Sequence, residues 1–269
     1  MLEEVFGTTS PVIGVIHLLP LPGSPRWDGQ MEPIFQRAEQ EAAALATGGV
    51  HGIIIENFFD APFAKSRVDT ATACALALVA KRVMAVCDLP IGINVLRNDG
   101  QTALAIAATV GARFVRVNVY AGAMVTDQGI IEGEAHQLLL YRRQLGADKG
   151  VKILADVMVK HAEPLSATSD IRQMAKDTVL RGLADGVIVS GIATGAAPDL
   201  GDLQAVREAV PSAPLFVGSG ATKENIASLL AIADGVIVGS TLKRQGVLEN
   251  PVDVERVRAL VASVEAVRV

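Results

Sequence analysis

The stretch Leu215-Phe216-Val217-Gly218-Ser219-Gly220-Ala221-Thr222 decides the fold, together with a second of the same design, Val236-Ile237-Val238-Gly239-Ser240-Thr241-Leu242-Lys243. Each is an apolar run of strand length that stops at glycine and leads toward a helix. Glycine lets the backbone approach a ligand, and the adjacent hydroxyl adds a hydrogen-bond donor. Backbone N–H groups at a helix start favour an anion. Two consecutive turns of this kind predict the phosphate site that follows the last two strands of a (β/α)8 barrel. Its predicted residues are Gly218, Ser219, Gly220, Gly239 and Ser240.

Six further apolar runs precede these two turns and alternate with patterns of helical period. The eight candidate strands are Val12–His17, Gly52–Glu56, Ile91–Val95, Phe114–Asn118, Lys152–Val157, Val187–Ser190, Leu215–Gly218 and Val236–Gly239. The chain has 269 residues, close to the ~250 of one barrel, and no linker divides it. We therefore expect an α/β fold, with residues 1–269 forming a single (β/α)8 TIM-barrel domain. Asn250 as cap and Pro251 at the first helical position predict the start of the last helix.

The composition narrows the class of protein. Hydrophobic residues make up 50% and aromatic residues 4%, which indicates an aliphatic core of the kind that parallel strands need. A net charge of −5 disfavours a nucleic-acid partner held by basic charge. Two cysteines make no disulfide framework, so a cytoplasmic location is expected. We predict no transmembrane segment, because the longest uncharged stretch, residues 5–25, is interrupted by prolines.

Polar residues stand at the expected carboxyl ends of the strands, where barrel enzymes carry their active sites. The predicted catalytic residues are His17, Glu56, Asn94, Asn118, Asp156 and Lys160. Glu56 and Asp156 are carboxylates in apolar strands, so they suit an acid–base pair with separated pKa values. The alternatives are a satisfied core histidine at position 17 and structural carboxylates at positions 56 and 156. No cofactor is indicated. A divalent metal ion on His17, Glu56, Asp156 and His161 is a weaker hypothesis, because no tight spacing supports it.

Two other segments carry predictions. The loop after the fourth strand contains Asp127, Gln128 and Gly129, and we interpret Asp127–Gly133 as a lid with glycine hinges or, alternatively, as a simple cover. The second helix is uncharged over residues 70–80, with Leu76 and Leu78 assigned to its outer face. This predicts a homo-oligomer, unless the helix is only alanine-rich and weakly amphipathic.

Several motifs resemble the signature of the BtpA/SgcQ family over nearly the whole chain. The motifs are Pro11-Val12-Ile13-Gly14-Val15-Ile16-His17-Leu18-Leu19-Pro20-Leu21-Pro22-Gly23-Ser24-Pro25, Ile55-Glu56-Asn57-Phe58, Gly92-Ile93-Asn94-Val95-Leu96-Arg97-Asn98-Asp99, Thr126-Asp127-Gln128-Gly129-Ile130-Ile131-Glu132-Gly133, Ala155-Asp156-Val157, Val159-Lys160-His161 and Leu215-Phe216-Val217-Gly218-Ser219-Gly220. One departure is Phe59, which stands where the family pattern has glycine. The resemblance implies a barrel of the ribulose-phosphate-binding type. It supplies no reaction, because one branch is named for photosystem I biogenesis and another for a sugar-metabolism gene cluster.

Three functions fit these observations. The first is an enzyme that acts on a small phosphorylated sugar or nucleotide-like metabolite by isomerase, epimerase or lyase chemistry. The second is a non-catalytic assembly or stability factor, with a role of the photosystem I biogenesis type. The third is an enzyme like phosphoribosylanthranilate isomerase. That reaction needs an acid and a thiol at the mouth, whereas the first strand ends in His17 and both cysteines map to the second helix.

Overall fold

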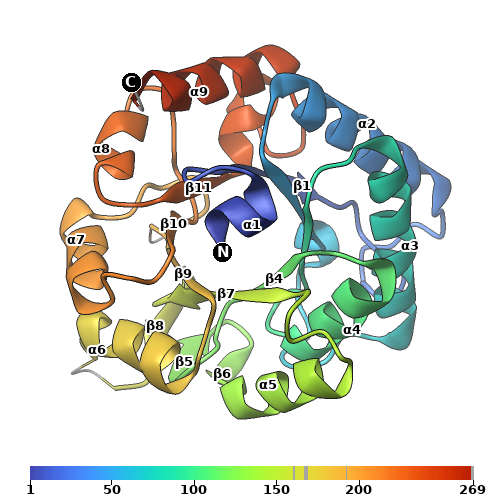
Figure 1. The fold of residues 1–269 in the computed structure, drawn as a ribbon. Helices are drawn as coiled ribbons and strands as arrows, with labels where there is room; N and C mark the ends of the chain where they lie inside the picture. The colour runs from blue at the N-terminus through green and yellow to red at the C-terminus, as the bar shows by residue number, and fades with distance from the viewer. Residues whose placement is uncertain (160, 167–168, 192, 268–269) are drawn as a thin grey trace.

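A computed structural model describes residues 1–159, 161–166, 169–191 and 193–267. In this part of the chain eight parallel strands form a closed barrel in the order β1-β11-β10-β9-β7-β4-β3-β2 (Figure 1). Their bounds are β1 (Val12–His17), β2 (Gly52–Glu56), β3 (Ile91–Asn94), β4 (Phe114–Val117), β7 (Lys152–Val157), β9 (Gly186–Val189), β10 (Leu215–Val217) and β11 (Gly235–Val238). The barrel closes because β1 pairs with both β2 and β11. The predicted (β/α)8 fold is confirmed, and each strand lies within one residue of its predicted bounds.

Helices cover the outside of the barrel. They are α2 (Glu32–Gly48), α3 (Thr70–Val86), α4 (Gly100–Val110), α5 (Ala135–Gln144), α6 (Ile171–Lys176) with the π-helical turn η2 (Asp177–Arg181), α7 (Leu200–Ala209), α8 (Ile226–Leu230) and α9 (Val254–Val267). Short 3-10 turns are η1 (Phe58–Asp60), η3 (Ser240–Leu242) and η4 (Arg244–Gly246). Side chains alternate between the two faces of a strand, so Ile53 and Ile55 of β2 pack in the outer cluster and Ile54 in the inner one. Both faces are therefore apolar, as the sequence predicted.

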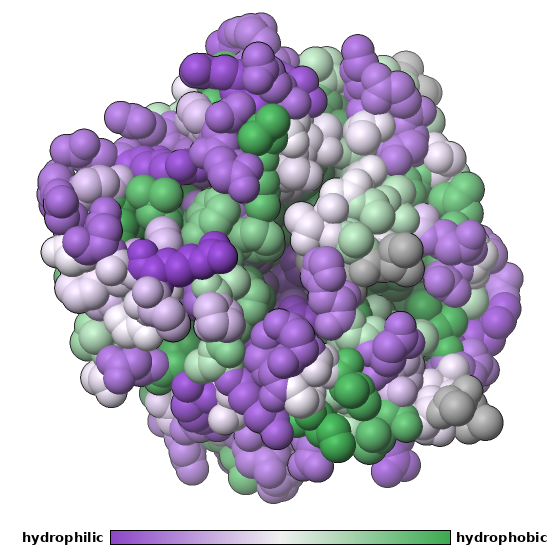
Figure 2. All heavy atoms as spheres, turned by 180° about the vertical axis from the view of Figure 1, so that it is seen from behind, coloured by the Kyte–Doolittle hydropathy of each residue, from purple (hydrophilic) through white to green (hydrophobic). Residues whose placement is uncertain are grey.

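The inner core is closed at one end by the N-terminal helix. Helix α1 (Leu2–Phe6) lies across the centre of the barrel in Figure 1 and buries Val5 and Phe6. The ring of Phe6 packs edge-to-face on Phe114 of β4 at 5.3 Å and on Phe216 of β10 at 6.2 Å between centroids. This end of the barrel is thus plugged by side chains. Figure 2 views the opposite end, where a hollow with a hydrophilic floor lies near the middle of the face.

The segment predicted as a lid is a β-hairpin rather than an irregular loop. Strands β5 (Ala123–Thr126) and β6 (Gly129–Glu132) are antiparallel, and β5 also pairs with β8 (Ala162–Pro164) from the loop after β7. Gly129 has a φ of 93°, which the tight turn requires, whereas Gly133 packs against the backbone of residues 120 and 121. Gly129 thus lies at the turn of the hairpin and Gly133 at its base, and the lid with glycine hinges stays a prediction.

Two helix predictions need correction. Helix α9 begins at Val254 instead of Pro251, because the carboxylate of Asp253 accepts the N–H of Glu255 at 3.0 Å. In α3, Leu76 is fully buried against the barrel, whereas Leu78 is 56% exposed. Only Leu78 of this pair therefore faces outward. No helix among the described residues is long and apolar enough to cross a membrane.

Candidate functional site at the mouth of the barrel

The alternation of side chains brings the polar residues of the strand ends to the barrel interior. The residue two positions beyond an inward apolar side chain faces the interior again. This rule leads from Val15 to His17, from Ile54 to Glu56, from Phe114 to Arg116, from Leu154 to Asp156 and from Ile188 to Ser190. The inner lining thus changes from apolar to polar at the carboxyl ends, which is the end opposite α1.

A buried ion pair forms the floor of the mouth. The Nε of Arg116 donates to Asp156 Oδ2 at 2.9 Å and its Nη2 donates to Oδ1 at 2.8 Å. Asn118 Nδ2 and Ser190 Oγ also donate to Asp156, at 3.0 and 3.2 Å. Four donors occupy the roughly four lone-pair positions of one carboxylate. Burial acts to lower the pKa of Arg116, but the charge of Asp156 outweighs it and the pKa is raised. Asp156 therefore fixes the guanidinium group of Arg116 and the amide group of Asn118 at the floor of the cavity.

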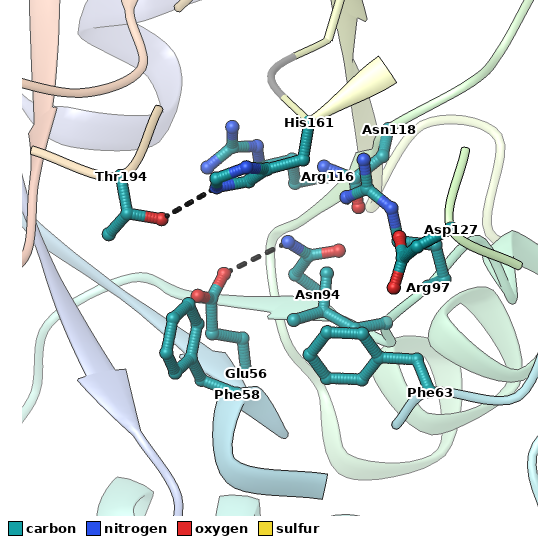
Figure 3. Close-up of a pocket in the computed structure, with 11 residues that line it drawn as sticks. Glu56, Phe58, Phe63, Asn94, Arg97, Arg116, Asn118, Asp127, His161 and Thr194 are labelled. Atoms are coloured by element: carbon teal, nitrogen blue, oxygen red, sulfur yellow. Dashed lines mark hydrogen bonds between the residues drawn. The ribbon is translucent and has the colours of Figure 1, made fainter. Parts of the chain in front are cut away.

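Glu56 lies beside this pair, with fewer contacts. Its Oε2 accepts a hydrogen bond from Asn94 Nδ2 at 3.0 Å (Figure 3). Its Oε1 lies 3.5 Å from His17 Nε2. The ring of Phe58 packs edge-to-face on His17, with 4.9 Å between centroids. Glu56 and His17 are both 5% exposed. Glu56 lines the cavity directly, so its carboxylate is placed to contact a ligand.

The cavity above these groups has a volume of about 290 Å³. It is lined by Glu56, Phe58, Phe63, Asn94, Leu96, Arg97, Arg116, Asn118, Asp127, His161 and Thr194 (Figure 3). Burial lowers the pKa of Arg97, although the charges of Asp156 and Asp127 oppose the shift. This volume is at the lower end of small-molecule sites, ~300–1,000 Å³, and suits a small metabolite rather than a dinucleotide.

Three loops form the rim of the cavity. Asp127 comes from the turn of the β5–β6 hairpin, His161 from the loop after β7, and Thr194 from the loop after β9. His161 Nε2 and Thr194 Oγ1 lie 3.1 Å apart across the rim. A second cavity of about 420 Å³ shares Asp127 and His161 with the first and continues beneath the hairpin. The two cavities therefore meet at the rim.

The glycine turns after β10 and β11 pack against other segments of the chain. Gly220 has a φ of 70° and packs against the backbone of residues 196 and 197, in the loop after β9. The hydroxyl of Ser219 accepts the N–H of Gly191 at 3.2 Å and donates to the carbonyl of Ala196 at 2.8 Å. Gly239 packs against the ring of His17. The glycines thus have a packing role, and the phosphate site stays a prediction.

A sequence model of the BtpA family matches residues 8–266. The chain belongs to the BtpA family. This match confirms the resemblance drawn from the motifs. The Photosystem I biogenesis protein BtpA of Synechocystis sp. is 55% identical over 260 residues, which cover 97% of this chain and 90% of that protein. The putative sgc region protein SgcQ of Escherichia coli is 33% identical and covers 99% and 98% of the two chains.

Solved structures of other families share the fold of this BtpA-family chain. The (S)-3-O-geranylgeranylglyceryl phosphate synthase from Thermoplasma acidophilum, in complex with sn-glycerol-1-phosphate, has a TM-score of 0.61 at 16% identity and covers 98% and 97% of the chains. The phosphoribosylanthranilate isomerase from Pyrococcus furiosus has a TM-score of 0.58 at 12% identity and covers 96% and 99%. At such low identity these likenesses concern the fold alone.

The structure brings together most of the predicted catalytic residues. Glu56, Asn94 and Asn118 line the cavity, His17 contacts Glu56, and Asp156 lies beneath Arg116. Lys160 falls outside the described residues. Within the described residues, no group of three or more His, Cys, Asp or Glu side chains is arranged to hold a metal ion. His17, Glu56, Asp156 and His161 therefore do not form a group of this kind.

Sequence reasoning missed the two arginines of the site. Arg116 is a charged residue between Val115 and Val117, two positions after Phe114, whose side chain faces inward. The period-2 pattern alone therefore assigns it to the interior. Arg97 follows β3 within the Leu96-Arg97-Asn98-Asp99 motif and is 5% exposed. No local pattern distinguishes it from a surface loop arginine.

Proposed function

We propose that this BtpA-family protein is an enzyme that acts on a small phosphorylated sugar or nucleotide-like metabolite, by isomerase, epimerase or lyase chemistry. One observation carries the proposal. A buried carboxylate, Glu56, faces a small cavity at the carboxyl ends of the strands, and amide and guanidinium groups surround it. A carboxylate in this setting can remove a proton from carbon and return it, while fixed donors stabilise the charge that develops on oxygen.

The contacts suggest a different role for each carboxylate. Glu56 keeps lone pairs for a ligand and is the proposed acid–base group, with His17 at 3.5 Å to receive or supply a proton. Asp156 already accepts four hydrogen bonds, so it is proposed as a positioning residue that fixes Arg116 and Asn118. Arg116 and Arg97 would then face the electron-rich part of the substrate.

The proposed phosphate site is formed by the turns at residues 218–220 and 239–240. Barrels of this class bind phosphate after their last two strands. The similar synthase structure is a complex with sn-glycerol-1-phosphate, which supports a phosphorylated ligand for the shared fold. Binding at these turns requires the loop around Ala196 and Ala197 to move away from Gly220.

A thermal-shift screen of phosphorylated metabolites tests the proposal, because a bound ligand raises the apparent stability by mass action. Turnover of each hit is then followed by NMR in wild type, in Glu56→Gln and in the exposed control Glu265→Gln. We expect Glu56→Gln to bind the hit and to lose about 10²–10⁴-fold in rate, the usual contribution of a general acid or base. Unchanged turnover in Glu56→Gln would refute the assignment.

A second function is supported by a relative. The 55% identity to a protein named for photosystem I biogenesis favours a role as a non-catalytic assembly or stability factor. In that case the outer surface, and not Glu56, carries the function. Complementation of a strain that lacks the gene separates the two functions, because the Glu56→Gln protein restores the wild-type phenotype only if no proton transfer is needed. An activity like phosphoribosylanthranilate isomerase is not proposed, since Cys74 lies on α3 and Cys87 at its end.

A further inference from the structure

Two asparagines at the floor of the cavity have orientations that are set by carboxylates. Asn94 Nδ2 donates to Glu56 Oε2 at 3.0 Å, and Asn118 Nδ2 donates to Asp156 Oδ2 at 3.0 Å. A carboxylate oxygen accepts hydrogen bonds, so each amide turns its NH2 group toward the carboxylate and its oxygen away. For Asn118 this orientation is enforced further, because Arg116 donates to the same Oδ2 atom. The two Oδ1 atoms are therefore fixed as acceptors.

Both of these amide oxygens are buried and have no hydrogen-bond partner among the described residues. Asn94 is 1% exposed and Asn118 is 3% exposed. Asn94 ends β3 and Asn118 follows β4 directly, and these two strands are neighbours because Asn94 pairs in register with Arg116. Both line the same cavity. Buried carbonyl oxygens almost always accept a hydrogen bond, so a ligand in the cavity is the expected source of the donor.

The remaining lining restricts the chemistry of that donor. Two guanidinium groups, Arg97 and Arg116, disfavour an ammonium group by like-charge repulsion. The two amide oxygens and Glu56 disfavour an anion at the same point. A hydroxyl group donates one hydrogen bond and accepts others, so it can bridge an amide oxygen and a guanidinium group. The rings of Phe58 and Phe63 offer an apolar wall for the C–H face of a ligand.

We infer that the mouth cavity binds the neutral, polyhydroxylated part of the ligand, a sugar or open-chain polyol, through hydroxyl groups that donate to Oδ1 of Asn94 and Oδ1 of Asn118. The inference rests on the proposed function for the identity of the ligand as a phosphate ester. It adds which end enters the cavity: the hydroxyls contact the asparagines, and the phosphate stays outside, toward the glycine turns.

Calorimetry with defined probes tests the inference. The probes are inorganic phosphate, glycerol 3-phosphate, ribose 5-phosphate, ribulose 5-phosphate, glucose 6-phosphate, fructose 6-phosphate, and the 2-deoxy forms of the ribose and glucose esters. We expect at least one polyol phosphate to bind more tightly than inorganic phosphate. In Asn94→Leu and Asn118→Leu, each tested for native circular dichroism, we expect that ester to lose about tenfold in affinity, the usual effect of one lost hydrogen bond, while inorganic phosphate is unaffected. Asn250→Leu, at a residue that does not line the cavity and whose amide also donates one hydrogen bond, is the matched control.

Each outcome decides one of the two claims. If every polyol phosphate binds no better than inorganic phosphate, or if the advantage survives in both folded asparagine variants, the inference is wrong. A deoxy form that binds as tightly as its parent shows only that the 2-hydroxyl is not among the contacts, and the asparagine variants then decide. If the polyol phosphates bind through the asparagines but Glu56→Gln leaves turnover unchanged, the inference stands and the proposed function fails.

Discussion

The substitution Asp156→Asn should destabilise the protein severely. In the wild type four donors from Arg116, Asn118 and Ser190 point at the Asp156 carboxylate, and the side chains of Arg116 and Asp156 are 3% and 0% exposed. An asparagine offers one acceptor oxygen and turns an NH2 group toward the other donors. Removing one partner of a buried ion pair costs about 3–5 kcal/mol, because the other charge is left uncompensated.

That loss is a large part of a typical total stability of about 5–15 kcal/mol. At about 2–4 °C of melting temperature per kcal/mol for a chain of this size class, it corresponds to a fall of roughly 6–20 °C. The assay is urea and thermal unfolding followed by circular dichroism, in Asp156→Asn, Arg116→Met and the double variant Arg116→Met/Asp156→Asn.

The double variant distinguishes the ion pair from simple packing. It removes both charges, so it should lose clearly less than the sum of the two single losses. Glu208→Gln, which breaks an exposed pair with Arg172, is the control and should leave the unfolding midpoint unchanged. A loss of less than about 1 kcal/mol in Asp156→Asn, at the level of an exposed ion pair, would refute the reasoning.

Four further predictions follow from other parts of the structure. Burial raises the pKa of Tyr120 from 10.0 to about 12, and its hydroxyl donates to the carbonyl of Gly182 at 2.5 Å. The stability that this residue contributes should therefore be complete below pH 10 and be lost between pH 10 and 12, and unfolding curves of Tyr120→Phe should lack this part of the pH dependence. Crystals soaked in phosphate should show the anion at residues 218–220 and 239–240, and an anion bound only elsewhere would contradict this site. Leu78→Glu on α3 should convert an oligomer to a monomer in light scattering across a dilution series, because Leu78 is 56% exposed; a wild type that is monomeric at micromolar concentration removes the case. Hydrogen exchange of the hairpin at residues 123–132 should slow when a ligand fills the mouth if the hairpin acts as a lid, and unchanged exchange with every ligand would speak against that role.

The barrel could be predicted from the sequence because each strand is a short, largely apolar run with glycine or a polar residue at, or next to, its carboxyl end. The alternation of side chains along a strand also predicts which residues face the interior of the barrel. Once Phe114 is placed inside, Arg116 must also face inward, and the ion pair with Asp156 becomes the natural expectation. The acid–base pair of Glu56 and Asp156, expected from the two carboxylates alone, does not take this arginine into account, and the four donors at Asp156 disfavour a proton-transfer role for it.

Other features could not be predicted, because they depend on contacts between distant segments. Strand β8 forms only against β5, some forty residues earlier in the chain, and its own sequence, Ala162-Glu163-Pro164, carries no strand signal. The burial of Leu76 depends on which face of an almost uniformly apolar helix meets the barrel, and an apolar pattern without a polar stripe does not specify that face.

The three-stranded sheet at the rim links two loops of the barrel, the one after β4 and the one after β7. Strand β5 lies in the loop after β4 and is hydrogen-bonded on one side to β6 and on the other to β8. A change in the length of either loop therefore shifts the register between β5 and β8. In relatives that bind a different ligand, the loop after β4 and the loop after β7 should therefore differ from those of this chain together. A chimera that transplants residues 120–133 alone should misalign Asp127 at the rim, and one that also transplants residues 158–166 should restore it.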